Sequence, residues 1–389
     1  MYLPCAFANN DFIVWRDSIV GQTEIVDALH ESINQDTLSH AMIIEGNSGY
    51  GGLPVVLSLA QHILCTQDGP SSCGQCKACQ QVDGLIHPDL HIAYPVVRKE
   101  GKERKNITSK DYMTEWRSMI LDNPYTTYNE WIRSIAKKTA NGDINVKECN
   151  DIIQQLNMQA FSGAQKVQII WIADRLGSNG NKLLKLIEEP PEGTFIFLIC
   201  DHIDTILKTI TSRCRVINMP RVDEASMTTA LSTTQDVEED QAKQISFISD
   251  GDFAQALTYA QLEQNNLMEL CLQWMKLCAD FDLQGLRQWS IEFGRFNSEE
   301  QKVILNYFLK VLQSVIYHQM IGPDAVKLSA TDKAMLLRNQ SLLSLTVDEI
   351  DLISQKVSRM ITMIQRYVTS RMVMFDASLS IGTLFKKRV

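Results

Sequence analysis

The chain has 389 residues, of which 45% are hydrophobic and 21% charged, and its formal net charge is −9. This length predicts two or three domains, and no apolar run reaches the ~18 residues that a membrane span requires. The net negative charge argues against broad, unaided DNA binding, although it is compatible with a local basic patch. The first fifteen residues lack a basic region before an apolar core, so we expect no signal peptide and a cytoplasmic location.

Short apolar runs alternate with helical patterns as far as residue 220. The strand candidates are residues 40–46, 89–95, 166–174, 194–200 and 215–220. Most of them are continuously apolar, which is typical of strands that are covered on both faces. The alternation predicts an α/β domain with a mostly parallel sheet over about residues 1–220.

The first strand candidate runs into a glycine-rich segment that approximates a P-loop. In a P-loop, a glycine, four residues, a second glycine, a lysine and a serine or threonine cradle phosphates. Gly46 and Gly51 take the two glycine positions, with Gly49 between them. Gly52 stands where the lysine is required, and Leu53 stands where the hydroxyl is required. The loop is therefore kept without the groups that hold a nucleotide.

Four of the ten cysteines form a cluster within fifteen residues: Cys65, Cys73, Cys76 and Cys79. The spacing C-x7-C-x2-C-x2-C offers four thiolates to one tetrahedral zinc ion. An iron–sulfur cluster also uses C-x2-C-x2-C spacing, so spacing alone does not decide the metal. Four free thiols are the remaining alternative. We favour a structural zinc, because the protein would fill all four coordination positions.

An insertion of about residues 96–143 interrupts the α/β pattern. A basic run over 98–110 precedes five aromatic residues, which are Tyr112, Trp116, Tyr125, Tyr128 and Trp131. Basic residues beside aromatic residues can grip a single nucleic-acid strand. The alternative, which we favour, is a solvated insertion whose aromatic rings pack a local helix.

A P-loop enzyme also needs a second strand that ends in acids, one for Mg²⁺ and often one for the attacking water. The candidate strand keeps its apolar residues, but Trp171 and Ile172 stand where an Asp-Glu pair is expected. Only Asp174 remains near that position. Losses in both halves of one site predict a chain that does not hydrolyse ATP.

After Pro220 the sequence predicts helices and no further strong strand. Residues 221–263 suggest a few short helices, and residues 264–389 suggest a bundle of long helices. Two apolar stripes at helical spacing predict core faces. They are Ile304, Phe308, Val311 and Val315 in one helix, and Ile353, Val357, Met360 and Ile364 in another.

Six motifs occur along the chain in this order: GNSGYGG, the four cysteines, HPDLH (87–91), IADRL (172–176), KLLKLIEEPPEGTFIFLIC (182–200) and TITSRCRVI (209–217). This order resembles the bacterial DNA polymerase III clamp-loader subunits, which are AAA+ proteins. Among them the chain is most similar to delta-prime subunits, which have no ATPase activity. The resemblance is dense from about 19 to 220. Two departures are the insertion and a first cysteine gap of seven residues where eight are expected.

The resemblance implies a three-domain protomer. An AAA+ α/β domain over 1–220 would carry the zinc module (65–79), followed by a helical lid over 221–263 and a helical collar over 264–389. The protomer would join clamp-loader ATPase subunits and the delta subunit in a hetero-oligomeric ring. That ring opens the sliding clamp and places it on primed DNA, with no membrane involved.

The resemblance also assigns Arg213, in the Ser-Arg-Cys motif, as an arginine finger for the ATP site of a neighbouring subunit. Ala254 takes the place of a nucleotide-sensing arginine of the active subunits. Two alternatives are an active clamp-loader ATPase with a degenerate loop, and a zinc-dependent nucleic-acid-binding protein built on the cysteines and the basic insertion. Whether a nucleotide still binds is left open.

Overall fold

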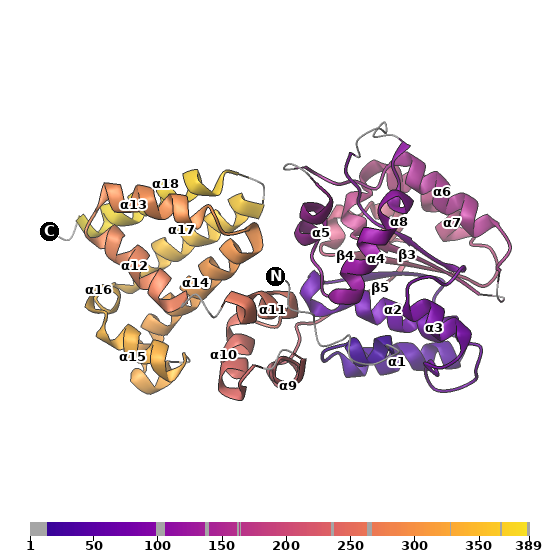
Figure 1. Cartoon of the computed structure of the whole chain (residues 1–389), viewed down its shortest axis with the longest axis horizontal. Coiled ribbons are helices and arrows are strands. Elements are labelled where there is room, and N and C mark those ends of the chain that lie inside the picture. Colours follow the sequence, from indigo (N-terminus) through magenta and orange to yellow (C-terminus); the bar gives the residue numbers. More distant parts are fainter. Residues whose placement is uncertain are drawn as a thin grey trace. The chain divides into compact units, whose positions relative to one another are not determined.

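The computed structural model describes residues 14–98, 106–136, 140–161, 163, 165–234, 237–262, 267–326, 328–365 and 368–386. The chain forms two compact units. The first extends as far as Ala230 and includes Gly251–Ala254, and the second holds Leu231–Asp250 and the chain from Gln255 onward. Figure 1 shows that the first unit contains the sheet and that the second is helical.

One sheet of five parallel strands organises the first unit, in the order β2-β3-β4-β1-β5. The strands are β1 (Ala41–Glu45), β2 (Leu90–Ala93), β3 (Lys166–Trp171), β4 (Thr194–Cys200) and β5 (Arg215–Asn218). Each of the five predicted strands is confirmed. All six residues of β3 are buried, including the polar Lys166 and Gln168, as expected for a strand that is covered on both faces.

The sheet separates two apolar cores, because successive side chains of a strand point to opposite faces. Met42 and Ile44 of β1 enter one core, whereas Ala41 and Ile43 enter the other. The first core is covered by α1 (Thr23–Asn34), α2 (Gly52–Ile63), α3 (Lys77–Asp83) and the insertion. The second is covered by α6 (Val146–Asn157), α7 (Leu184–Glu188) and α8 (Lys208–Thr211). Figure 1 shows these helices around the strands.

The insertion folds as the short 3-10 helix η5 (Ser109–Tyr112), α4 (Met113–Asp122) and α5 (Tyr128–Ile135). Its five aromatic residues named above are 0–7% exposed. Tyr94 stacks on Trp116 with 4.8 Å between ring centroids, and all of the five rings except Tyr125 belong to the first core. The hypothesis that these rings stack on a nucleic-acid strand is therefore wrong. Residues 99–105 of the basic run lie outside the described residues.

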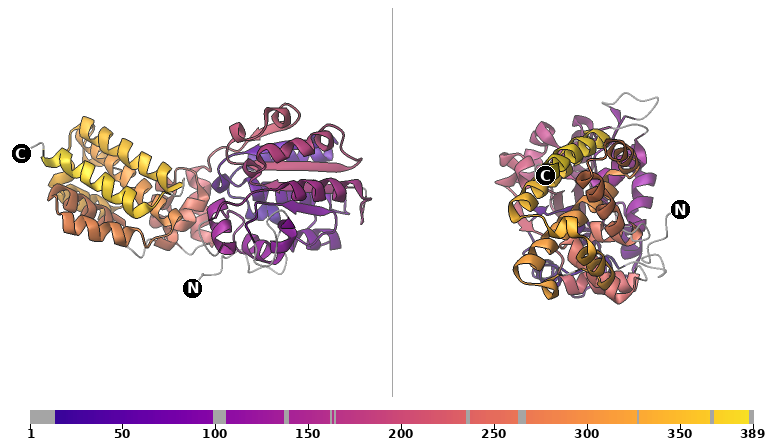
Figure 2. Two further views of the ribbon diagram at one scale, coloured as in Figure 1. Left: turned by 90° about the horizontal axis from the view of Figure 1, so that it is seen from above. Right: turned by 90° about the vertical axis from the view of Figure 1, so that its left-hand side faces the viewer.

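The second unit is a helical assembly, and its helices lie alongside one another (Figure 2). They are α10 (Glu239–Ser249), α11 (Phe253–Leu262), α12 (Leu267–Ala279), α13 (Leu283–Phe293), α14 (Ser298–Met320), α15 (Ala330–Arg338), α16 (Gln340–Leu343), α17 (Val347–Gln365) and α18 (Ser370–Lys386). The first two residues of α11 belong to the first unit, and α9 (Glu224–Thr234) crosses the boundary between the units.

The two predicted apolar stripes are confirmed, since all eight residues are buried in α14 and α17. The separate lid, predicted over 221–263, stays a prediction. Within the described ranges, no helix combines the length and the hydropathy needed to cross a membrane.

Candidate functional site

The glycine-rich segment is a compact connection from β1 to α2. The chain leaves β1 through Gly46, forms the 3-10 helix Ser48–Tyr50, and enters α2 at Gly52. Gly51 has a φ of 89°, in the left-handed region that favours glycine. The loop expected from the sequence is therefore present as a strand-to-helix turn.

The two positions that hold a nucleotide in a P-loop belong to the apolar core in this chain. A Cβ atom on Gly52 would lie 3.4 Å from both Ile44 and Ile199. Leu53 is 4% exposed and joins the same core. The side chain of a lysine at position 52 would therefore begin against apolar residues of β1 and β4. These positions serve packing here.

The residues at the end of β3 also pack in the core. Trp171 and Ile172 are buried, and the Trp171 ring meets Trp116 of the insertion at 6.0 Å between centroids. Asp174 accepts hydrogen bonds from the backbone N–H groups of the two residues after β4, each at 3.0 Å. It accepts a third from Thr205 Oγ1 at 2.9 Å. Its carboxylate therefore holds the turn after β4.

Two side chains from distant parts of the first unit lie against the glycine loop. A Cβ atom on Gly51 would lie 3.4 Å from the ring and the hydroxyl of Tyr125. The Tyr125 hydroxyl is buried and accepts a hydrogen bond from Val20 N at 2.7 Å. A Cβ atom on Gly49 would lie 1.8 Å from Asp252 Oδ1, so a carboxylate contacts the loop directly. Neither side chain belongs to the loop motif.

Ala254 also lies at the loop. Its backbone nitrogen is 3.0 Å from the point that a Cβ atom on Gly49 would occupy. The structure therefore brings the position predicted to have lost a sensing arginine next to the degenerate loop. The role of that position stays a prediction.

Two carboxylates, those of Asp201 and Asp252, lie at the loop. Asp201 accepts a hydrogen bond from Ser48 Oγ at 3.0 Å. Burial, and then the negative charge of Asp174, raises the pKa of Asp201 from 3.8 to about 6, and Asp252 acts in the same direction. The phosphates of a nucleotide are anions, so this environment opposes their binding.

We expect Asp201→Asn to stabilise the protein above about pH 6 and to have little effect near pH 4. The folded-state pKa of about 6 lies above the unfolded value near 3.8. The stability that protonation contributes is therefore present below about pH 4 and is lost as the pH rises through about 6. Asparagine keeps an oxygen for the Ser48 hydroxyl and carries no charge, so we expect a gain of about 1–2 kcal/mol at neutral pH. Urea unfolding at both pH values measures it, and an equal effect at both would contradict the assignment.

The four clustered cysteines converge although they lie on different elements. Cys65 follows α2, Cys73 lies in the connecting loop, Cys76 is the N-cap of α3, and Cys79 lies within α3. Their sulfur atoms all lie within 4.8 Å of one another. The Cys65–Cys76 and Cys73–Cys79 sulfur distances are 3.9 and 3.8 Å. Four sulfurs at about 2.3 Å from one tetrahedral zinc ion would be about 3.8 Å apart, so the cluster could hold a single metal ion.

Backbone N–H groups point at the sulfurs of this cluster. Cys76 N lies 3.3 Å from Cys73 Sγ, and Cys79 N lies 3.4 Å from Cys76 Sγ. Gly74, between the ligands, has a φ of 70°. Hydrogen bonds of this kind favour the thiolate form that a metal ion requires.

Arg213 lies in the turn between α8 and the edge strand β5. Its Nη1 donates to Thr209 O at 2.9 Å and to Ser212 Oγ at 3.1 Å, and its Nε forms an ion pair with Glu188. The side chain is 38% exposed. None of these partners belongs to the glycine loop. The structure therefore does not join Arg213 to the chain's own degenerate loop.

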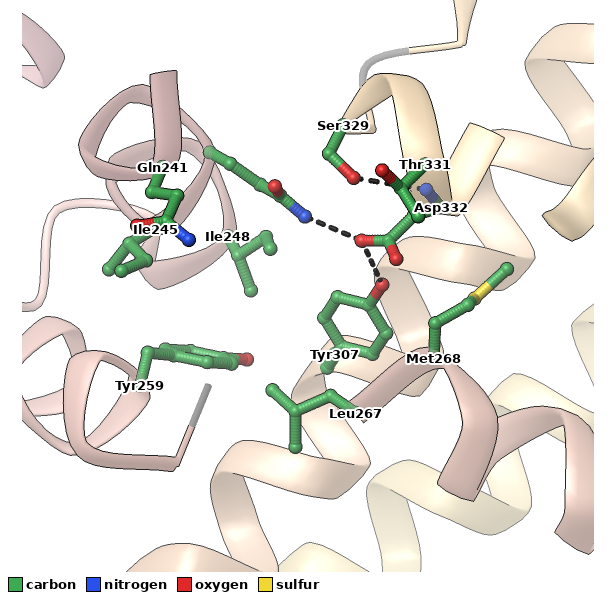
Figure 3. Close-up of a pocket in the computed structure, with 11 residues that line it drawn as sticks. Gln241, Ile245, Ile248, Tyr259, Leu267, Met268, Tyr307, Ser329, Thr331 and Asp332 are labelled. Atoms are coloured by element: carbon green, nitrogen blue, oxygen red, sulfur yellow. Dashed lines mark hydrogen bonds between the residues drawn. The ribbon is translucent and has the colours of Figure 1, made fainter. Parts of the chain in front are cut away.

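The second unit contains a cavity of about 350 Å³ (Figure 3). Its lining residues are Gln241, Gln244, Ile245, Ile248, Tyr259, Leu267, Met268, Tyr307, Ser329, Thr331 and Asp332. Asp332 accepts a hydrogen bond from Gln244 Nε2 at 2.7 Å. It accepts another from the Tyr307 hydroxyl at 2.8 Å, as Figure 3 shows. These bonds link α10, α14 and α15. None of the predicted site residues lines this cavity. We interpret the hydrogen bonds of Asp332 as contacts between helices.

A protein-family match falls within the first unit. A family model described as DNA polymerase III, delta subunit, matches residues 21–223. That segment holds all five strands, the glycine loop, the four cysteines and Arg213.

Curated relatives match a similar length of the chain. A DNA polymerase III subunit delta′ of Bacillus subtilis (strain 168) is 26% identical over 206 residues, which are 53% of this chain and 49% of that protein. A subunit delta′ of Haemophilus influenzae is 29% identical over 181 residues, 46% of this chain and 42% of that protein. The chain thus spans about half the length of the curated relatives it matches. Because the family model covers just over half of the chain, the chain belongs to the DNA polymerase III delta-subunit family and is delta-prime-like.

Proposed function

We propose that the chain is a non-hydrolysing, delta-prime-like subunit of the DNA polymerase III clamp loader. It assembles with clamp-loader ATPase subunits and the delta subunit in a ring, helps that ring load the sliding clamp on primed DNA, and supplies Arg213 to a neighbouring ATP site. The relatives named subunit delta′ support the assignment to this complex. The parallel sheet with a glycine loop after β1 supports an AAA+ type of domain.

The proposal that the chain does not hydrolyse ATP rests on the glycine loop, which forms a packed turn. ATP hydrolysis requires cationic groups and a metal ion around the β- and γ-phosphates. Here the lysine and hydroxyl positions are Gly52 and Leu53, both buried. Tyr125 and the Asp252 carboxylate lie against the same loop. The loop therefore connects β1 to α2, and the negative charge beside it would repel a phosphate group.

The exposed guanidinium of Arg213 supports the second part of the proposal. A guanidinium stays charged and can donate charge-assisted hydrogen bonds to phosphate oxygens. Arg213 lies beside the edge strand of the sheet, where a neighbouring subunit can approach. An arginine supplied in this way stabilises the charge that develops during phosphoryl transfer.

We propose further that the cysteine cluster holds one structural zinc ion. Zinc with four thiolate ligands has no open position for a substrate or an attacking water, so it acts in folding. Cys65 and Cys76 lie at the facing ends of α2 and α3. An ion bound to both would fix the connection between these helices.

The purified chain alone is expected not to hydrolyse ATP, and to co-elute in gel filtration with a clamp-loader ATPase subunit and the delta subunit. Magnesium-dependent phosphate release measures the first result, with the ATPase subunit as the positive control. Turnover by the chain alone would favour an active ATPase. Salt-sensitive DNA binding by the chain alone, without ring assembly, would favour the nucleic-acid-binding alternative.

A further inference from the structure

The last residue of α7, Glu188, is bound to Arg213. α7 ends there because Pro190 follows, and the residue before a proline is disfavoured in helical conformation. The Glu188 carboxylate forms its ion pair with Nε of Arg213, while Nη1 is held by Thr209 O and Ser212 Oγ. No described residue accepts a hydrogen bond from Nη2. The guanidinium is thus held at two nitrogens, and the third is available to a ligand.

We propose that Glu188 is a positioning residue for Arg213, an inference that rests on the proposed function of Arg213. A long arginine side chain loses rotamer freedom when it is fixed in one geometry. The hydrogen bond from Nε to Glu188 fixes part of that geometry before a phosphate arrives. Because both side chains are partly exposed, at 38% and 44%, their attraction contributes little to folding stability. The acceptor therefore acts mainly on the orientation of the guanidinium.

The acceptor atom matters more than the negative charge of Glu188. Glutamine keeps an oxygen that accepts the same Nε–H bond, so we expect Glu188→Gln to hold Arg213 as the wild type does. It also removes a charge that opposes phosphate, so its rate should equal or exceed that of the wild type. Alanine removes the acceptor, so we expect Glu188→Ala to lower turnover about two- to fivefold.

The test is ATP hydrolysis by complete rings, reconstituted with the wild-type subunit or its variants and checked by gel filtration. We expect Glu188→Ala to lower kcat with little change in KM, because the arginine acts on charge that develops in the transition state. The matched control is Glu189→Ala, since Glu189 is the adjacent exposed carboxylate and is not bound to Arg213. This control should leave turnover unchanged.

A double-mutant cycle with Arg213→Ala completes the test. If Glu188 acts through Arg213, Glu188→Ala has no further effect in rings that already carry Arg213→Ala. An equal loss in both backgrounds would overturn the inference, as would unchanged turnover for Glu188→Ala when Arg213→Ala is impaired. Unchanged turnover for Arg213→Ala itself would instead overturn the proposed function on which the inference rests.

Discussion

Arg213→Ala is expected to lower ATP hydrolysis and clamp loading by reconstituted rings while leaving their assembly intact. An arginine supplied from a neighbour can raise the rate of phosphoryl transfer by roughly 10³–10⁵-fold at its own site. The ring has several ATP sites and Arg213 would serve one of them. The loss for the whole complex should therefore be smaller, about two- to tenfold. Folding should change little, because the side chain is 38% exposed and its ion pair with Glu188 lies at the surface.

Two further variants test whether the geometry of the guanidinium matters and not only its charge. Arg213→Lys should rescue poorly, since an ammonium group lacks the separate nitrogens that let a guanidinium be held at Nε and Nη1 while Nη2 faces a phosphate. Arg215→Ala is a matched control, because Arg215 is a nearby exposed arginine at the start of β5. Clamp-stimulated phosphate release by rings of verified composition is the measurement. Wild-type rates with the Arg213→Ala rings would show that Arg213 is not an arginine finger.

The strands could be predicted because a strand that is buried on both faces consists mostly of apolar residues, and this pattern is local in the sequence. The last six residues of β4 (195–200) are all apolar, and this run indicates a covered strand without knowledge of the fold. The missing nucleotide groups at Gly52 and Leu53 could also be read from spacing alone. The spacing does not show that these positions lie in the core, because that depends on Ile44 and Ile199 of two neighbouring strands.

The side chains that lie against the glycine loop could not be predicted. Tyr125 comes from the insertion, and Asp252 comes from the segment that returns to the first unit after α10. Neither residue has a local signature, since their contacts with Gly51 and Gly49 arise only when the chain folds. Motif spacing identifies what a site has lost and does not identify what contacts the remaining loop.

Both partners of the Arg213 ion pair lie in motifs that were recognised from the sequence, yet their pairing was not predicted. Glu188 ends α7, and Arg213 follows α8. The side-chain contact depends on how these two helices pack beside the sheet. By contrast, the cysteine cluster was predictable, because Cys73, Cys76 and Cys79 lie close in sequence and a short turn brings them together.

Cys76→Ser is expected to release one tightly bound zinc ion per chain and to destabilise the first unit. Metal bound by the folded state contributes to folding stability, and loss of one thiolate weakens that binding strongly. The surrounding segment keeps other anchors, since Gln61 Nε2 donates to Cys79 O at 3.3 Å and Trp15 Nε1 donates to Val82 O at 3.3 Å. We therefore expect partial loosening, with a loss of roughly 2–4 kcal/mol and not complete unfolding.

Elemental analysis and thermal unfolding measure these two effects, and two further variants separate coordination from packing. Cys73 is the exposed member of the cluster, so Cys73→Ser alters packing least and should still release the metal. Gln75→Ser changes an exposed residue between the ligands and leaves all four thiols, so it should keep both the zinc and the melting temperature. Equal melting temperatures for Cys73→Ser and Gln75→Ser, together with no metal in the wild-type protein, would rule out a structural zinc. Iron and sulfide in place of zinc would identify the iron–sulfur alternative, whose ligands follow the same C-x2-C-x2-C spacing.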